Sequence, residues 1–333
     1  MTFDQIIRDL KNKVYHPVYF LIGDEPYYID EIADYIEGNV LDEAEKGFNQ
    51  CVLYGRDADP DTIIENAKRF PMMANHQVVI VKEAQDVKGI EALQPYIENP
   101  LDSTILVICC KYKKLDKRKT FTKMLAQKAV LFESKKMYDN KIPDWILKKL
   151  QQENYSISPK ACVLLSEYLG NDLGKITNEL EKLMLNVPEG AEIITEHIEQ
   201  NIGISKDFNV FELQDAIGKK DALKANRIVN YFGKNTRSHP LVLTMSSLYS
   251  YFSKLLQYHF LKDKSQNNVA SVLRVHPFFV NGYQHAARNY NIKGVANAIG
   301  YLREYDRKSK GMGSTGNVPE GELLKEMIYK ILH

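Results

Sequence analysis

The stretch Val18-Tyr19-Phe20-Leu21-Ile22-Gly23 is a short apolar run that ends in glycine. Such a run indicates a buried β-strand followed by a turn. Beyond the turn, apolar residues recur at helical spacing, at Ile29, Ile32, Ala33 and Ile36. This spacing predicts a helix over 28–36. The chain is therefore expected to begin with a strand–turn–helix unit of the kind that builds α/β domains.

Further strands are predicted downstream of this unit. Strand-like segments lie at 49–54, 78–81, 105–109 and 129–132, and segments with helical patterns separate them. Apolar strands that alternate with helices indicate a parallel sheet covered on both faces. Residues 1–138 are thus predicted to form one α/β domain.

The rest of the chain is predicted to be helical. Helical patterns at 141–152, 158–170, 172–185 and 194–202 indicate a small helical domain over 139–205. Residues 206–333 are also helical in pattern, with the longest segment at 240–262. The predicted fold class is α/β plus all-α, in three domains, which suits a chain of 333 residues because one hydrophobic core rarely serves that length.

The turn after the first strand has the position of a phosphate-binding loop but not its residues. Such a loop requires G-x-x-x-x-G-K-[ST]. Gly23 fills the first place, whereas Tyr28, Ile29 and Asp30 replace the second glycine, the lysine and the hydroxyl residue. Tyrosine obstructs close approach of the backbone to phosphate, isoleucine supplies no cation, and aspartate repels phosphate from a helix N-terminus.

The residue that follows the strand at 78–81 also argues against a nucleotide site. An ATPase carries a magnesium-binding aspartate after this strand, but Lys82 stands there. We therefore expect no ATP hydrolysis. Two interpretations of the loop remain open: an ordinary βα turn, or a nucleotide fold that has lost its site.

Two other segments have surface chemistry. Six basic residues fall within nine positions: Lys111, Lys113, Lys114, Lys117, Arg118 and Lys119. Two interpretations are open, a contact with the phosphate backbone of DNA or a solvated loop. The sequence Phe70-Pro71-Met72-Met73 follows a predicted helix. Methionine adapts to irregular binding surfaces, although the pattern alone favours core packing at a helix end.

Composition excludes several classes of protein. Apolar residues make up 44% of the chain and charged residues 26%, an ordinary composition for a soluble protein. Residues 1–110 carry 9 basic and 20 acidic side chains, and residues 206–333 carry 19 and 10, which suggests surfaces for different partners. The four cysteines form no CxxC pair, so neither disulfides nor a zinc site are expected. We expect a cytoplasmic protein without a signal peptide, a membrane span, a metal, a cofactor or a catalytic pair of acids.

Three stretches in their order and spacing resemble the delta subunit of bacterial DNA polymerase III, which belongs to the clamp loader that opens the sliding clamp. They are the opening strand with its altered loop at 18–28, the segment 70–81, and Gly170-Asn171-Asp172-Leu173 leading into Asn178-Glu179-Leu180-Glu181-Lys182-Leu183. The resemblance covers essentially the full chain. It implies an AAA+-like α/β domain, a helical lid domain and a C-terminal helical collar domain.

The resemblance also implies a function. The chain is expected to be a non-hydrolysing subunit of the DNA polymerase holoenzyme, a nucleotidyltransferase complex, and to bind and open the sliding clamp. The family places its clamp contact at a helix tip, at the positions of Met72 and Met73, flanked by Phe70 and Pro71; the family often has Leu-Phe there. Other loader subunits would join through 206–333, and primed DNA would bind within the complex. The alternatives are a stand-alone nucleic-acid-binding protein and an NTPase with an atypical phosphate loop.

Overall fold

The computed structural model describes residues 1–205, 207–312 and 318–333, which form two compact units. The first unit comprises Met1–Tyr138 with Asn171–Lys175, and the second comprises Asp139–Gly170 with Ile176–His333. The first boundary between the two units thus lies after Tyr138. The finer division into three domains at 138 and 205 stays a prediction.

A five-stranded parallel sheet forms the centre of the first unit, with the strand order β2-β3-β4-β1-β5. The strands are β1 (Val18–Gly23), β2 (Gln50–Tyr54), β3 (Gln77–Lys82), β4 (Thr104–Lys111) and β5 (Val130–Ser134). The three central strands are almost entirely buried because helices cover both faces. The predicted parallel sheet is confirmed.

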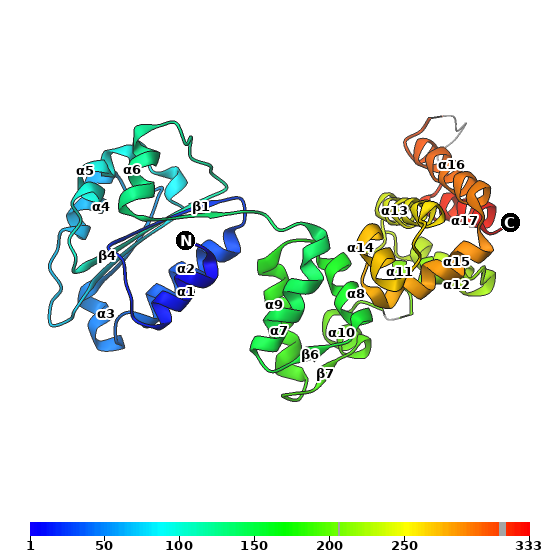
Figure 1. The fold of residues 1–333 in the computed structure, drawn as a ribbon, viewed down its shortest axis with the longest axis horizontal. Helices are drawn as coiled ribbons and strands as arrows, with labels where there is room; N and C mark the ends of the chain where they lie inside the picture. Colours follow the sequence, from blue (N-terminus) through cyan, green and yellow to red (C-terminus); the bar gives the residue numbers. More distant parts are fainter. Residues whose placement is uncertain (206, 313–317) are drawn as a thin grey trace. The chain divides into compact units, whose positions relative to one another are not determined.

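Helices lie on both sides of this sheet (Figure 1). Helices α1 (Phe3–Lys11) and α2 (Pro26–Asn39) pack on one face, and α4 (Pro60–Ala67), α5 (Gln94–Glu98) and α6 (Thr120–Lys128) pack on the other. The short α3 (Glu43–Asn49) directly precedes the edge strand β2, and the 3-10 turns η1 (Ala84–Asp86) and η2 (Ile90–Leu93) follow β3. Helix α4 begins at Pro60, because Asp59 accepts a hydrogen bond from the Thr62 amide at 2.8 Å and proline suits the first turn.

The second unit is nearly all helical. Its N-terminal part contains the turn η3 (Asp139–Lys141) and the helices α7 (Ile142–Gln152), α8 (Pro159–Leu169), α10 (Thr195–Ile202) and α9 (Leu173–Asn186), the last of these from Ile176 on. Two short parallel strands, β6 (Ser156–Ile157) and β7 (Glu192–Ile193), pair beside these helices. The sequence does not predict this pair.

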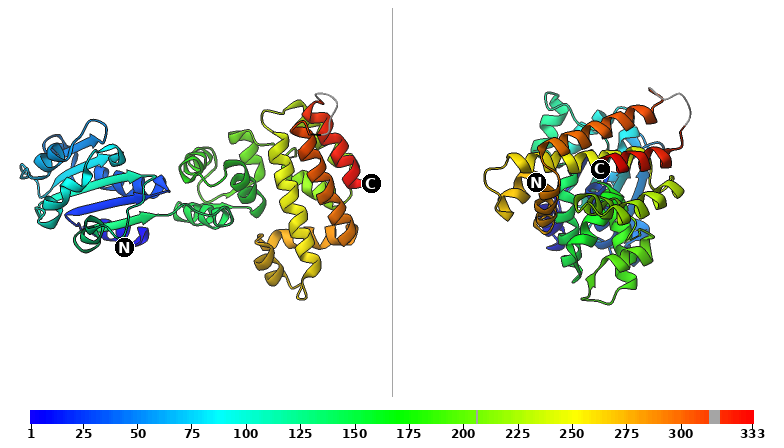
Figure 2. Two further views of the ribbon diagram at one scale, coloured as in Figure 1. Left: turned by 90° about the horizontal axis from the view of Figure 1, so that it is seen from above. Right: turned by 90° about the vertical axis from the view of Figure 1, so that its right-hand side faces the viewer.

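The C-terminal part has one large apolar core. It contains α11 (Val210–Gly218), α12 (Ala222–Lys234), α13 (Leu241–Phe260), α14 (Gln266–Leu273), η4 (Pro277–Phe279), α15 (Val280–Asn289), α16 (Ile292–Ser309) and α17 (Glu320–Leu332). The long helices α13, α16 and α17 lie side by side (Figure 2, yellow to red). Helices α12 and α17 approach closely because Gly233 and Gly321 face each other; a Cβ on Gly321 would lie 2.9 Å from the Gly233 Cα.

Ion pairs to the buried Glu212 tie helices of this unit together. The Glu212 carboxylate of α11 binds Lys160 of α8 at 2.5 Å and also binds Lys224 of α12. Burial alone would raise the pKa of Glu212, but the hydrogen bonds donated by the two lysines lower it below its ordinary value. The network thus links α8 to the C-terminal helices.

Candidate functional site

The turn after β1 is set by contact with β5. Gly23 has φ +133°, and a Cβ at this position would lie 1.9 Å from the Ser134 carbonyl oxygen. The Asp24 amide donates to that same oxygen at 2.9 Å, and the Tyr112 amide donates to the Gly23 carbonyl at 2.8 Å. Glycine is therefore required here by close packing of backbone on backbone.

The N-terminus of α2, where a phosphate would bind in a nucleotide fold, is occupied by a carboxylate. Glu25 is buried, and its Oε1 accepts a hydrogen bond from the Tyr27 amide at 3.3 Å. The Ser134 hydroxyl donates to the Glu25 carbonyl at 2.7 Å, which fixes this residue. Burial raises the pKa of Glu25. A side chain of this chain thus caps the amide groups that bind anions in phosphate loops.

Of the other predicted loop residues, Ile29 is fully buried in the core on the α1–α2 face of the sheet. Tyr28 is half-buried, and its ring lies 4.7 Å from the ring of Phe3. Asp30 forms an ion pair with Lys111 at 2.8 Å. These three side chains have packing or ion-pair partners within the protein.

Ion pairs also cross the carboxyl ends of the strands, where α/β sheets bind their ligands. Lys111, at the end of β4, lies 2.8 Å from Asp30 and 2.9 Å from Glu83. Burial alone would lower the pKa of Lys111, but the hydrogen bonds to the two carboxylates raise it above its usual range. Lys82 is bound to Glu37 at 2.8 Å and to Asp34 of α2 at 3.3 Å. The strand ends therefore hold a protein-internal charge network.

The apolar segment 70–73 lies in a loop on the surface. Helix α4 ends at Ala67 and β3 begins at Gln77. Phe70 is 74% exposed, Met72 63% and Met73 101%. Pro71 is partly buried. Core packing at a helix end, the interpretation favoured by the residue pattern, is therefore wrong. Met72 and Met73 therefore lie beyond the end of α4 rather than on a helix tip.

This loop has a defined backbone. The Asn49 side chain, which is fully buried, accepts a hydrogen bond from the Met72 amide at 2.6 Å and donates to the Met72 carbonyl at 2.9 Å. Met73 has a left-handed conformation, with φ +56°. The sequence gives no signal for Asn49, because its partner lies 23 residues further along the chain. The loop thus presents three exposed apolar side chains from a hydrogen-bonded backbone.

The six predicted basic residues at 111–119 all have partners within the first unit. Lys113 donates to the Gln85 carbonyl at 2.8 Å. Lys111 forms the ion pairs described above, and the remaining four residues form the ion pairs Lys114–Asp24, Lys117–Glu133, Arg118–Asp116 and Lys119–Glu91. Lys117 and Arg118 nevertheless have side chains that are 82% and 91% exposed. Exposed pairs of this kind contribute little stability and can exchange for other anions.

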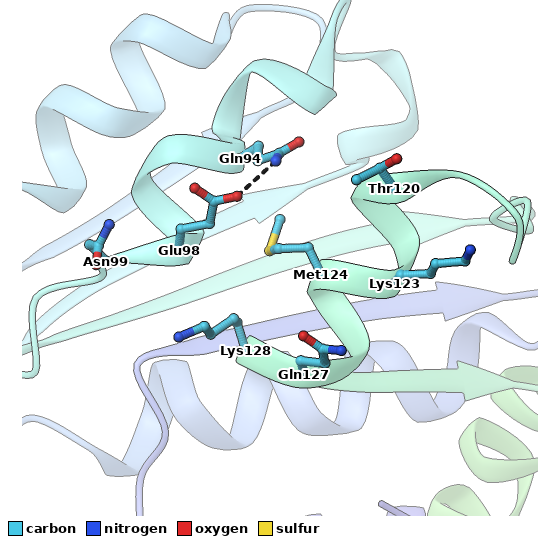
Figure 3. Close-up of a pocket in the computed structure, with 8 residues that line it drawn as sticks. All are labelled: Gln94, Glu98, Asn99, Thr120, Lys123, Met124, Gln127 and Lys128. Carbon is cyan, nitrogen blue, oxygen red and sulfur yellow. Dashed lines mark hydrogen bonds between the residues drawn. The ribbon is translucent and has the colours of Figure 1, made fainter.

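A shallow depression lies between α5 and α6 in the first unit (Figure 3). Its volume is about 430 Å³, and its lining comprises Gln94, Glu98, Asn99, Thr120, Lys123, Met124, Gln127 and Lys128. On the α5 side of this depression, the Gln94 amide donates to the Glu98 carboxylate at 2.7 Å. Acidic, basic and amide groups are mixed in the lining, so no one ligand charge is selected.

Within residues 1–205, 207–312 and 318–333, no three His, Cys, Asp or Glu side chains are grouped so that they could hold a metal ion. In the same ranges no helix combines the length and the apolar character that crossing a bilayer requires.

The parallel five-stranded sheet and the helical parts that follow it define an α/β plus all-α protein, the predicted fold class. The model of the family "DNA polymerase III, delta subunit" matches residues 19–135, and the model of the "DNA polymerase III delta subunit, C-terminal domain" matches residues 207–329. The chain belongs to the DNA polymerase III delta subunit family, a component of the DNA replication machinery.

Two relatives from Bacillus subtilis are similar over nearly their whole length. DNA polymerase III subunit delta of strain 168 is 28% identical over 345 residues, which covers 100% of this chain and 97% of the relative. The solved structure of the DNA clamp loader delta protein is 26% identical, with a TM-score of 0.53 and coverage of 99% of both chains. The expected family and fold class are thereby confirmed.

Proposed function

We propose that this subunit binds the sliding clamp through the loop Phe70–Met73 and favours the open clamp, without hydrolysing ATP itself. The observation that carries the proposal is the exposure of Phe70, Met72 and Met73 on a loop whose backbone is fixed. Large apolar side chains grouped on a surface mark interaction sites. The clamp-loader delta protein similar to this chain makes the sliding clamp the partner that fits.

The anchor side chains are large enough to supply a substantial affinity. Full burial of one such side chain contributes roughly 1.5–3 kcal/mol, so Met72 and Met73 together contribute on the order of 3–6 kcal/mol. A few central side chains of this kind dominate many interfaces. Opening then requires only that the subunit bind the open clamp more tightly than the closed one, because a ligand shifts a population by its differential affinity.

The absence of ATP chemistry is part of the proposal. The carboxylate of Glu25 caps α2, and the ion pairs of Lys111 and Lys82 cover the strand ends. An incoming triphosphate would meet a negative cap and would have to break these pairs. The energy of ATP would instead enter the complex through partner subunits. Calorimetric titration with Mg-ATP tests this point: no heat of binding is expected, and micromolar binding would favour the NTPase alternative.

Other subunits of the loader would join through 206–333. Helix α13 supports this assignment, since Val242, Leu243, Tyr249 and Phe260 are all more than half exposed. Primed DNA would be held within the assembled complex, where Lys117 and Arg118 are the most exposed cations of the basic segment. A stand-alone DNA-binding protein would instead show steep salt dependence of DNA binding and no affinity for the clamp.

The clamp contact is tested by surface plasmon resonance on immobilised clamp. The double variant Met72→Ser, Met73→Ser is expected to bind at least a hundredfold more weakly, since about 3 kcal/mol corresponds to that factor. The matched control is Val242→Ser, Leu243→Ser, a second exposed apolar pair, on α13. The control should retain full clamp affinity. Wild-type affinity in a folded Met72, Met73 variant would refute the anchor.

A further inference from the structure

Asn49 is placed so that both polar atoms of its side chain serve the apolar loop and its own helix. The residue ends α3 and is fully buried. Its amide nitrogen donates to the Met72 carbonyl at 2.9 Å and to the Glu45 carbonyl at 3.0 Å, and its oxygen accepts from the Met72 amide at 2.6 Å. One side chain thus bridges α3 and the loop at the first methionine of the pair.

The neighbouring residue, Phe48, is an exposed aromatic beside this bridge. Its side chain is 73% exposed, and Ala44 and Gly47 are also exposed on the same helix. Because Asn49 is bonded to Met72, the end of α3 and the loop are adjacent, although 23 residues separate them in sequence. Phe48 is therefore one residue from the side chain that holds the Met72 backbone.

We propose that the clamp-binding surface consists of two segments, the loop Phe70–Met73 and Phe48 of α3, and that Asn49 is the positioning residue that holds them together. The inference rests on the proposed function, since it extends the same surface toward the same partner. Phe48 adds an aromatic contact, the residue class enriched at the centres of interfaces. Asn49 adds preorganisation, because a loop already fixed by two hydrogen bonds loses less conformational entropy on binding.

The arrangement gives Phe48 and Asn49 different roles. Phe48 contacts the clamp directly, so its removal weakens binding whether or not the methionines are present. Asn49 acts through the loop, so its removal matters less once the methionines are replaced. A double-mutant cycle separates these two cases, because residues that act through a shared partner do not contribute additively.

The contact role is tested by measuring clamp affinity of Phe48→Ser by surface plasmon resonance. A roughly tenfold loss is expected from removing one aromatic contact at the edge of the anchor. The control is Tyr54→Ser, an exposed aromatic on β2 of the same unit that lies outside the two segments. The control should bind like the wild type. Wild-type affinity of Phe48→Ser, together with a weakened Met72, Met73 double variant, would overturn this inference and leave the proposed function standing.

The opposite result is also distinguishable. If Phe48→Ser weakens binding while the Met72→Ser, Met73→Ser variant binds normally, the anchor of the proposed function is wrong and the surface is centred on α3. The two variants measured side by side therefore assign a failure to one claim or the other.

The positioning role is tested by two readouts on Asn49→Ala. Hydrogen exchange of the Met72 amide should become faster while the amides of β2 and β3 keep their protection, which shows that the sheet is folded. Clamp affinity should fall roughly fivefold in the wild-type background and by a smaller factor in the Met72→Ser, Met73→Ser background. Asn49→Asp, which can still accept from the Met72 amide but cannot donate to its carbonyl, should be intermediate in both. Faster exchange with wild-type affinity in these variants would overturn the positioning role.

Discussion

Gly23→Ala provides a test of why the chain keeps a glycine where a phosphate loop would have one. The added Cβ would lie 1.9 Å from the Ser134 carbonyl oxygen and 2.6 Å from the carbonyl carbon, and both atoms belong to the backbone of β5. No rotamer change can relieve this overlap. The φ of +133° adds strain, because side chains other than glycine rarely adopt it.

The loss of stability in Gly23→Ala can be estimated from the backbone strain and the steric overlap. A residue held in a sparsely populated backbone region costs roughly 1–3 kcal/mol, and overpacking adds roughly 1–3 kcal/mol. The first unit should therefore lose about 2–6 kcal/mol, a large part of the 5–15 kcal/mol typical of a folded domain. Loss of 2 kcal/mol corresponds to about thirtyfold faster exchange of the most protected amides.

Native-state hydrogen exchange resolved by peptide measures this effect without assuming one unfolding transition for both units. Peptides from β1, β4 and β5 should exchange at least thirtyfold faster in Gly23→Ala. Gly38→Ala is the matched control: Gly38 lies in α2, and a Cβ there would meet nothing within 4 Å. That variant should be unchanged or slightly stabilised, because alanine is the better helix former. Exchange of Gly23→Ala within twofold of the wild type would refute the packing explanation.

Three further variants test other contacts. Lys111→Met leaves two carboxylates without their shared cation and should destabilise the first unit by roughly 1–2 kcal/mol in urea denaturation, a value reduced because both acids are partly exposed. Glu212→Gln should lower the stability of the second unit at pH 7, because a carboxyl whose pKa is lowered on folding stabilises the protein above its ordinary pKa of 4.5. The deficit should shrink as the pH falls below 4.5 and through the lowered pKa of Glu212, and a deficit that stays constant over this fall in pH would contradict the explanation. Gly321→Val should lower the unfolding temperature of the second unit through overlap with Gly233, at a cost of roughly 1–3 kcal/mol, whereas an unchanged melting curve would show that α12 and α17 can separate freely.

The sheet is predictable because its strands are short apolar runs between turns. Three of them, β1, β3 and β4, are buried on both faces, so their residues are nearly all apolar. Helix α1 is absent from the sequence-based prediction, although Thr2 and Gln5 form a capping box that signals its start. The pairing of β6 with β7 has no such signal, since each strand has only two residues and the partner is distant in sequence.

The candidate site is predictable in its residues but not in its presentation. Apolar pattern alone cannot tell whether Met72 and Met73 point into a core or into solvent, because both environments suit methionine. In the tertiary structure the buried Asn49 binds the Met72 backbone, and both methionine side chains are exposed. The role of Lys111 is likewise set by the tertiary structure. In the sequence it is one of six basic residues, whereas in the fold it pairs with two acids of the same unit.

The most direct test of the account is the affinity of the purified chain for the sliding clamp, measured by surface plasmon resonance with and without Mg-ATP. The loop Phe70–Met73 is already exposed, and the strand ends are closed by internal ion pairs. We therefore expect the isolated subunit to bind the clamp without nucleotide and with the same affinity when Mg-ATP is present. Failure to bind, or binding that depends on ATP, would contradict the account.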